Sequence, residues 1–317
     1  MTSQIAGAPQ PGDGESGGEK SGRRGTVRYL KDEAVPSAPR MLLGYVLRNR
    51  RTALGLKLQE VALRTGCSSS KLSRIESGHH AFKEKDLLQF FTVYEVQDGE
   101  QQRILLGLAE IANQPTWWQK WSAVAQPYLQ AVVSFEDMAT RTKASSAQLL
   151  HGLLQTPAYA EALIRRGRGG NGVHDALLAL RRERQERFAS APDKILIVVI
   201  YEAAVLHAVG NPEIMAEQMD HLVDLSRKRN YQLRLAEQGR YDLPVELGTT
   251  TIFDFEGRVP KVAYQESVDG ALFIQDEELV DYREKLFDRL RARSLGPVAT
   301  RRKLQHLADK YRSPKLL

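Results

Sequence analysis

The segment between Leu43 and Gly78 constrains the fold most, because short apolar stripes follow one another there and a glycine closes each. Residues that recur at i, i+3 and i+4 mark one face of a helix. Glycine ends a helix at little cost because it adopts positive φ. The stripes are Leu43-Val46-Leu47, Leu58-Val61-Ala62 and Leu72-Ile75, and the closing glycines are Gly55, Gly66 and Gly78. The pattern predicts three short helices joined by tight turns.

Two further apolar stripes extend the helical pattern. Leu87, Leu88, Phe91 and Tyr94 mark a fourth helix, and a fifth stripe from Ile104 to Ile111 follows a candidate cap at Asp98. Five short helices in succession predict a compact, mainly α domain.

The second and third predicted helices, joined by Thr65-Gly66-Cys67, have the size of a helix-turn-helix, in which one helix enters the major groove of DNA. Small Ala62 permits close crossing, and Ser68 is placed to cap the third helix. Hydroxyl and cationic side chains contact base edges and phosphates. The predicted base-reading residues are the polar ones on the third helix: Ser69, Ser70, Lys71, Ser73 and Arg74.

The excess of positive charge lies in the same segment. The chain has 45 Lys and Arg against 39 Asp and Glu, a net charge of +6. Residues 40–80 hold eight of the basic residues and only two of the acidic ones, so the remainder of the chain is neutral. A confined positive field is typical of phosphate binding. A solvated, Arg-rich helix face is the alternative, and charge alone does not separate the two.

The residues of the predicted helix-turn-helix resemble those of a known family. The run Leu54–Gly78, LGLKLQEVALRTGCSSSKLSRIESG, is similar to the XRE (Cro and phage-repressor type) helix-turn-helix, which ends in a Ser-Arg-Ile-Glu-x-Gly run. The resemblance implies that Gln59 contacts a phosphate and that Arg51 and Glu76 form a structural ion pair. Lys57, in place of a capping Ser, and His79-His80, in place of Arg, depart from the pattern. We predict DNA-backbone contacts from Gln59, Arg48, Ser68 and His79.

The chain divides by composition into four segments. Residues 1–38, rich in Gly, Ser and Pro, predict a disordered leader, because such residues bury little apolar area. We expect the DNA-binding domain over 39–97, a connecting helix over 98–116 and a regulatory or dimerisation domain over 117–313.

The last segment predicts an α+β domain with a small mixed sheet. Helices are expected at about 135–150, 157–166, 174–189, 212–229, 276–294 and 298–312. Strands are expected where β-branched and aromatic residues concentrate: Ile195–Tyr201, Tyr231–Leu235, Thr249–Phe255, Val262–Glu266 and Ala271–Ile274. Trp117, Trp118 and Trp121, all within five residues, favour a buried domain seam over a platform for bases.

This segment also resembles a family. Trp117-Trp118 and the runs 152–160, 181–187, 202–206 and 210–218 are similar to a C-terminal domain of unknown function found in actinobacterial regulators resembling WhiJ. His151 stands where that family commonly has Pro. The resemblance implies a role in development or antibiotic production and a small partner protein encoded nearby. It transfers no ligand and no catalytic residue.

Several other patterns in the sequence have simpler explanations than a functional site. Gly167–Gly172 matches G-x-G-x-x-G, but a predicted helix precedes it where a dinucleotide loop needs a strand. The interleaved signs of residues 181–187 favour pairing at i, i+3 and i, i+4 on an exposed helix. The histidines of this segment stand singly, and we interpret them as surface or packed residues rather than as ligands. Glu202 and Glu266 lie at the ends of predicted strands, and we interpret them as capping or exposed residues. Cys67 stands alone, so it forms no internal disulfide and no zinc site.

No apolar run is long enough to span a bilayer, and the first 40 residues lack the apolar stretch of a secretory signal. We therefore expect a cytoplasmic, nucleoid-associated protein with no metal and no cofactor. No nucleophile elbow, HExxH pair or P-loop is present, so we expect no enzyme activity.

The leading hypothesis is a sequence-specific transcription regulator that binds a near-palindromic operator in double-stranded DNA as a homodimer. Its second domain would receive a partner protein or a small molecule. The alternative is an antitoxin-like or anti-regulator module paired with the product of a neighbouring gene. An enzyme assembled from distant residues is the third hypothesis, and the sequence gives it no support.

Overall fold

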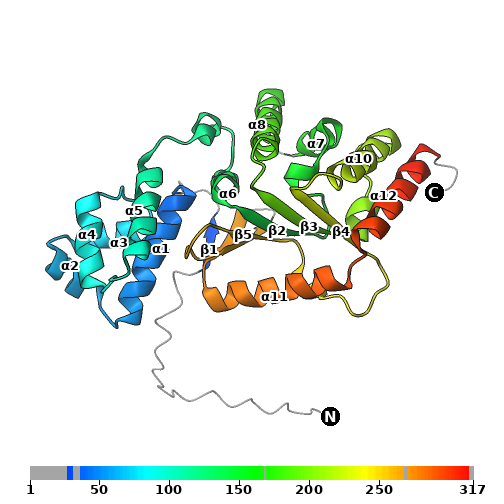
Figure 1. Ribbon diagram of the computed structural model, residues 1–317. Helices are drawn as coiled ribbons and strands as arrows, with labels where there is room; N and C mark the ends of the chain where they lie inside the picture. The colour runs from blue at the N-terminus through cyan, green and yellow to red at the C-terminus, as the bar shows by residue number, and fades with distance from the viewer. Residues whose placement is uncertain (1–26, 31–35, 168, 268–269, 314–317) are drawn as a thin grey trace, which may run out of the picture.

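The computed structural model describes residues 27–30, 36–167, 169–267 and 270–313, and it has a helical part followed by a mixed α and β part (Figure 1). The helical part comprises α1 (Ala38–Ala53), α2 (Leu58–Thr65), α3 (Ser69–Glu76), α4 (Glu84–Val93) and α5 (Gly99–Asn113). Gly55, Gly66 and Gly78 follow the first three helices with φ of +67°, +64° and +78°. The predicted fold class, a mainly α N-terminal domain followed by an α+β domain, is confirmed.

The five helices share one hydrophobic core. Leu43 and Leu47 of α1 meet Val61 of α2 and the buried side chains of α3 and α4 there. Helix α5 adds Leu105, Leu108, Ala109 and Ala112 to the same cluster. The segment that we expected to connect the two domains is thus packed into the helical one.

The second part is built on a mixed sheet with the strand order β1-β7-β6-β5-β2-β3-β4. Strands β2, β3 and β4 are parallel, and the other neighbours are antiparallel. The strands are β1 (Val27–Leu30), β2 (Arg141–Ser146), β3 (Ile195–Tyr201), β4 (Tyr231–Ala236), β5 (Thr250–Asp254), β6 (Val262–Ser267) and β7 (Gly270–Ile274).

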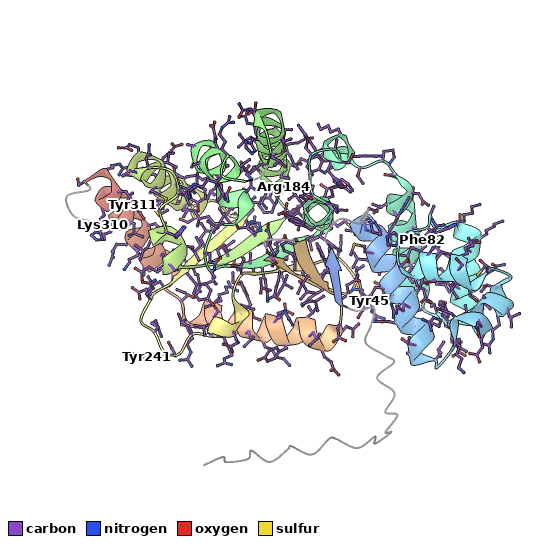
Figure 2. The ribbon with its side chains drawn as sticks, turned by 180° about the vertical axis from the view of Figure 1, so that it is seen from behind. Tyr45, Phe82, Arg184, Tyr241, Lys310 and Tyr311 are labelled. Carbon is purple, nitrogen blue, oxygen red and sulfur yellow. The ribbon has the colours of Figure 1, made fainter. Side chains whose placement is uncertain are left out.

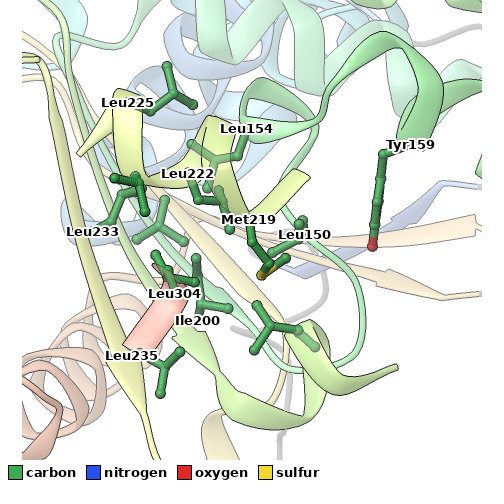
Figure 3. Packing of buried hydrophobic residues seen from close by; sticks show 14 of the residues in the cluster. Leu150, Leu154, Tyr159, Ile200, Met219, Leu222, Leu225, Leu233, Leu235 and Leu304 are labelled. Carbon is green, nitrogen blue, oxygen red and sulfur yellow. The ribbon is translucent and has the colours of Figure 1, made fainter. Parts of the chain in front are cut away.

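Helices cover both faces of this sheet (Figure 1). Helix α11 (Glu277–Arg293) packs on one face through Val280, Leu286, Phe287 and Leu290. The other face carries α6 (Pro127–Met138), α7 (Pro157–Ile164), α8 (Asn171–Ala189), α10 (Pro212–Leu225) and α12 (Pro297–Arg312). Short turns of helix complete the chain: α9 (Glu202–Leu206), η1 (Trp117–Trp121), η2 (Gly152–Leu154) and η3 (Val245–Leu247). Figure 3 shows leucines of the larger core, with Leu222 from α10, Leu233 from β4 and Leu304 from α12.

The helix predicted over 135–150 is wrong beyond its first four residues. Helix α6 ends at Met138, and residues 141–146 form β2, which lies between β5 and β3. The strand reads Arg-Thr-Lys-Ala-Ser-Ser, without the apolar residues that usually mark a buried strand. Some of its polar side chains find partners outside the strand, and Lys143 Nζ pairs with Glu284 of α11 at 2.9 Å. Ser145 Oγ, for example, donates to the carbonyl of Gly248 at 2.6 Å.

Part of the leader that we expected to be disordered is ordered. Residues 27–30 form β1, which pairs antiparallel with β7, so that Val27 faces Ile274 across the ladder. The pairing satisfies backbone groups of both strands, and this offsets the cost of ordering the segment. The rest of the predicted leader, apart from its end at residues 36–38, lies outside the described residues.

Helix α1 joins the helical part to the sheet (Figure 1). While Leu43 and Leu47 enter the helical core, Met41 and Leu42 on another face join Phe135 and sheet residues in a second cluster. The N–H of Ala38 donates to Ser134 Oγ on α6 at 2.8 Å. Two cores thus share one helix. Figure 2, which labels Tyr45 on α1, shows this helix between the other four and the sheet.

The tryptophans pack inside the second part of the chain. Trp118 is buried with Val133 of α6 and Leu180 of α8, and Trp117 and Trp121 pack against the same cluster. Trp121 Nε1 donates to Glu183 on α8 at 3.1 Å. The predicted burial is present, but the seam between the two parts is formed by α1 instead.

The expected surface pairing along α8 is only partly present. Arg187 and Glu183 form an i, i+4 pair at 3.9 Å, as expected. Arg184, however, points inward and is buried against Glu136 of α6, and Figure 2 labels it beside the sheet. Alternating charge signs do not reveal which guanidinium faces the core, so this part of the interpretation was wrong.

Candidate nucleic-acid interface

The turn between α2 and α3 is built from local contacts. Gly66 adopts the left-handed conformation after α2, and the N–H of Cys67 donates to the carbonyl of Ala62 at 3.1 Å. Ser68 then caps α3, because its Oγ accepts from the N–H of Lys71 at 3.1 Å. Leu72 and Ile75 are buried. The two helices therefore form a helix-turn-helix unit whose second helix is anchored by its apolar face.

A close helix crossing holds α3 against α1. A Cβ atom at Gly44 would lie 2.6 Å from the backbone oxygen of Glu76 and 2.8 Å from that of Ile75. Real Cβ atoms do not come so near to backbone oxygens. Only glycine therefore permits this approach, and it sets the distance between the third helix and the rest of the domain.

A buried ion pair fixes the end of α3. Arg51 donates from Nε to Glu76 Oε1 at 2.6 Å and from Nη2 to Oε2 at 2.9 Å. Its Nη1 also donates to the carbonyl of Leu56 at 2.8 Å. The hydrogen bond to Glu76 raises the pKa of Arg51, and burial raises the pKa of Tyr94, which donates to the same carboxylate. The pair that the resemblance implied is present, and it serves the scaffold.

The outward side of α3 is polar and open. Ser70, Ser73 and Arg74 are exposed, and Ser69 is half-buried. The guanidinium of Arg74 makes one long contact within the described part of the chain, from Nη2 to the carbonyl of His79 at 3.4 Å. Its donors are thus largely available to a ligand. A row of hydroxyls and one extended cation on a fixed helix can donate to base edges or phosphates.

Lys71 is held by a neighbour that the sequence did not indicate. Its Nζ lies 2.8 Å from Asp86 Oδ2, on the first turn of α4. Asp86 is 9% exposed, whereas the Lys71 side chain is 32% exposed. This carboxylate competes with any phosphate or base for the ammonium group. The signal was weak in the sequence, since the two residues are fifteen positions apart.

The predicted backbone contacts fall into two groups. Gln59, exposed on the first turn of α2, lines an open groove together with Ser68 and Ser69. Arg48 lies half-buried on α1, and exposed His79 follows α3, with its Nδ1 3.1 Å from Ser77 Oγ. The structure therefore brings Gln59 and Ser68 together and places Arg48 and His79 outside the residues that line the groove.

Leu63 is a further candidate that the sequence analysis missed. It lines the same groove and is 85% exposed. An apolar side chain that faces the major groove of bound DNA can contact the methyl group of thymine. Leu63 lies between buried Ala62 and exposed Arg64. No sequence pattern marked it as a candidate, because a single exposed leucine is common on protein surfaces.

The described residues hold neither a cluster suited to a metal ion nor a helix suited to a membrane. No group of three or more His, Cys, Asp or Glu side chains there is arranged to hold a metal ion. No helix there has the length and apolar character needed to cross a membrane.

Comparison with known protein families gives two matches. Residues 42–104, which cover most of the five-helix part, match a helix-turn-helix domain. Residues 129–306 match a family described as a domain of unknown function, DUF5753. No curated protein and no solved structure matches the chain.

Proposed function

Because the chain belongs to the DUF5753 family and carries a helix-turn-helix domain ahead of the family's domain, we propose that it is a sequence-specific, DNA-binding transcription regulator. The observation that carries this proposal is the outer face of α3. Its polar side chains Ser70, Ser73 and Arg74 face solvent, while Leu72 and Ile75 anchor the helix.

In finer detail, we propose an XRE-type helix-turn-helix in a regulator resembling WhiJ. It binds a near-palindromic operator as a homodimer, with α3 of each subunit in a major groove. Ser69, Ser70, Lys71, Ser73 and Arg74 read bases, whereas Gln59, Arg48, Ser68 and His79 contact the backbone. The protein works in the cytoplasm, on the nucleoid, and carries out no catalysis.

The second domain, on this proposal, dimerises and receives a signal from a small molecule or from a small partner protein. The support comes from its firm attachment to the DNA-binding part. Helix α1 is packed into both cores, and Arg258 of the second part pairs with Asp98 at the start of α5 at 2.9 Å. A change in the second domain therefore bears directly on the helix that positions α3.

The test is binding of the purified protein to its own promoter region and to unrelated duplex DNA. Arg74→Ala is expected to lose about 1–3 kcal/mol of operator preference if the guanidinium contacts a base. Gln59→Ala is expected to weaken binding to all sequences alike. Arg289→Ala, which removes an exposed cation from α11, is the matched control and should bind as the wild type does.

Two results would overturn the assignment. Normal operator preference in Arg74→Ala would show that α3 is not the reading helix. Salt-insensitive or absent DNA binding, together with a stable complex with the product of a neighbouring gene, would favour the antitoxin-like module instead.

A further inference from the structure

An open groove lies beside the start of α3. Its lining comes from α2, from the turn and from the first residue of α3: Gln59, Ala62, Leu63, Gly66, Cys67, Ser68 and Ser69. The groove has a volume of about 460 Å³, which is in the size range of protein sites that take a small organic group. It is therefore large enough to admit a group of the size of a nucleobase.

Leu63 forms an apolar wall of this groove that the fold itself does not use. It is 85% exposed, whereas Leu88 on α4, the next most exposed leucine in the described part of the chain, is 48% exposed. Leu63 is also absent from the hydrophobic core of the five helices. Covering apolar surface of this kind releases free energy. The side chain is thus available to whatever occupies the groove.

The groove is continuous with the proposed DNA interface. Gln59 and Leu63 are four residues apart on α2, so they lie on the same side of that helix. Ser69, at the start of α3, lines the groove with them. In a helix-turn-helix the first residues of the second helix contact base edges, while the first helix crosses the DNA backbone. The groove therefore joins a residue proposed to contact the backbone to one proposed to read bases.

The floor of the groove is small and uncharged. A Cβ atom at Gly66 would meet no atom within 4 Å apart from its chain neighbours, so the turn opens on empty space. Ala62 is buried, and Cys67 Sγ lies 3.1 Å from Thr65 Oγ1. None of the residues that line the groove is a Lys, Arg, Asp or Glu. Such a lining suits the uncharged edge of a base better than it suits a phosphate group.

The charges around the groove favour a strand of DNA as its occupant over an apolar protein segment. Lys57 and Arg64, at the two ends of α2, are exposed and form no ion pair within the described residues. The only acidic residues of the segment 40–80 are both engaged. Glu60 Oε2 accepts from the N–H of Lys57 at 2.7 Å, and Glu76 is buried in its ion pair. DNA supplies phosphates for the free cations and base edges for the groove.

We propose that Leu63 is a specificity-determining residue that contacts the C5-methyl group of a thymine in the operator. This step rests on the proposed function, because it takes α3 as the reading helix. The methyl group of thymine is the apolar feature that the major groove presents, and an aliphatic side chain covers it without a hydrogen bond. The hydroxyls of Ser69 and Ser70 pair with several bases, so they discriminate weakly. Leu63 adds a preference for thymine beside the start of α3.

The experiment begins with the full-length protein, which selects its preferred duplex from a pool of random sequences. Each thymine of that duplex is then replaced singly by deoxyuridine, which lacks only the C5-methyl group. At one thymine at least, the wild type is expected to bind roughly fourfold more weakly after the replacement, the effect of leaving one methyl group uncovered.

Variants assign this effect to a side chain. Leu63→Ala removes most of the apolar surface and favours the helix, and the exposed position makes misfolding no concern. At the responsive position it is expected to bind the thymine and deoxyuridine duplexes equally well. Leu88→Ala, the same substitution at an exposed leucine outside the groove, is the matched control and should keep the fourfold difference.

The outcomes separate this inference from the proposed function. A wild type that selects a duplex but responds to no thymine methyl group overturns the role of Leu63 and leaves DNA recognition standing. A full deoxyuridine effect in Leu63→Ala also overturns it, and shows that the groove faces something other than DNA, such as a protein. If the pool yields no preferred duplex, the proposed function fails, and the inference fails with it.

Discussion

Acid sensitivity of the fold is expected to depend on His151. Its pKa, about 4 in the folded protein, lies below the ordinary value of 6.5. The unfolded chain therefore takes up a proton first as the pH falls. The neutral ring stabilises the fold fully above pH 6.5, and that contribution is lost progressively down to about pH 4.

The size of the effect follows from the two pKa values. Between pH 7 and pH 5, preferential protonation of the unfolded chain lowers the free energy of unfolding by about 2 kcal/mol. Burial opposes a positive charge on the ring, Arg184 and Arg181 act in the same direction, and the attraction of Glu136 offsets these effects only in part. Burial acts to raise the pKa of Glu136, but the charge of Arg184, its hydrogen bond and the nearby charges of His151 and Arg181 together outweigh burial, so the pKa is lowered and Glu136 stays ionised throughout this range.

The assay is urea unfolding at pH 7 and at pH 5 for the wild type and for His151→Asn. Asparagine retains an acceptor for the N–H of Leu153 but does not titrate. Between pH 7 and pH 5, the free energy of unfolding of the variant is expected to fall by about 2 kcal/mol less than that of the wild type. His306→Gln, which alters an exposed histidine on α12, controls for the general loss of an imidazole. An equal loss in His151→Asn and in the wild type would refute the reasoning.

Three further predictions concern the DNA-binding part. Gly44→Ala places a methyl group 2.6 Å from the backbone oxygen of Glu76, and it should destabilise the protein by about 1–3 kcal/mol in chemical denaturation despite the better helix propensity of alanine. Glu76→Gln leaves Arg51 buried without a counter-charge and should cost about 3 kcal/mol or more, by the same measurement. Asp86→Asn frees Lys71, so DNA binding should tighten at low salt, and the plot of log affinity against log salt should steepen by about one. A loss of affinity in Asp86→Asn would instead mean that the carboxylate positions the ammonium group for binding.

Features that depend on neighbouring residues could be predicted from the sequence. The turns at Gly66 and Gly78 were predictable because glycine alone adopts positive φ cheaply, and both φ values are positive. The polar side of α3 followed from the spacing of Leu72 and Ile75 alone. The ion pair between Arg51 and Glu76, which anchors α3, was predicted from the family resemblance and not from the spacing of residues.

Features that depend on distant partners could not be predicted. The six residues of β2 are a strand because β3 and β5 flank them, and their own composition gives no sign of it. Strand β1 pairs with β7, almost at the other end of the chain. In the same way, nothing around Arg184 indicates that its partner is Glu136, forty-eight residues earlier.

The candidate sites show the same division. Exposure of Ser70, Ser73 and Arg74 follows from helical periodicity and was expected. The tie between Lys71 and Asp86 requires the packing of α4 against the recognition unit, which periodicity does not contain.

Helix α1 contributes side chains to two hydrophobic cores. The DNA-binding domain is therefore not an independent unit of the kind that is joined to its partner domain by a flexible linker. Truncation after α5 would expose the apolar side chains of Met41 and Leu42 to water. The isolated DNA-binding domain would then be prone to aggregation. Fusion of the DNA-binding domain to a different effector domain would require an apolar surface on that domain to cover Met41 and Leu42. A substitution on the shared face of α1 would therefore affect the packing of both parts.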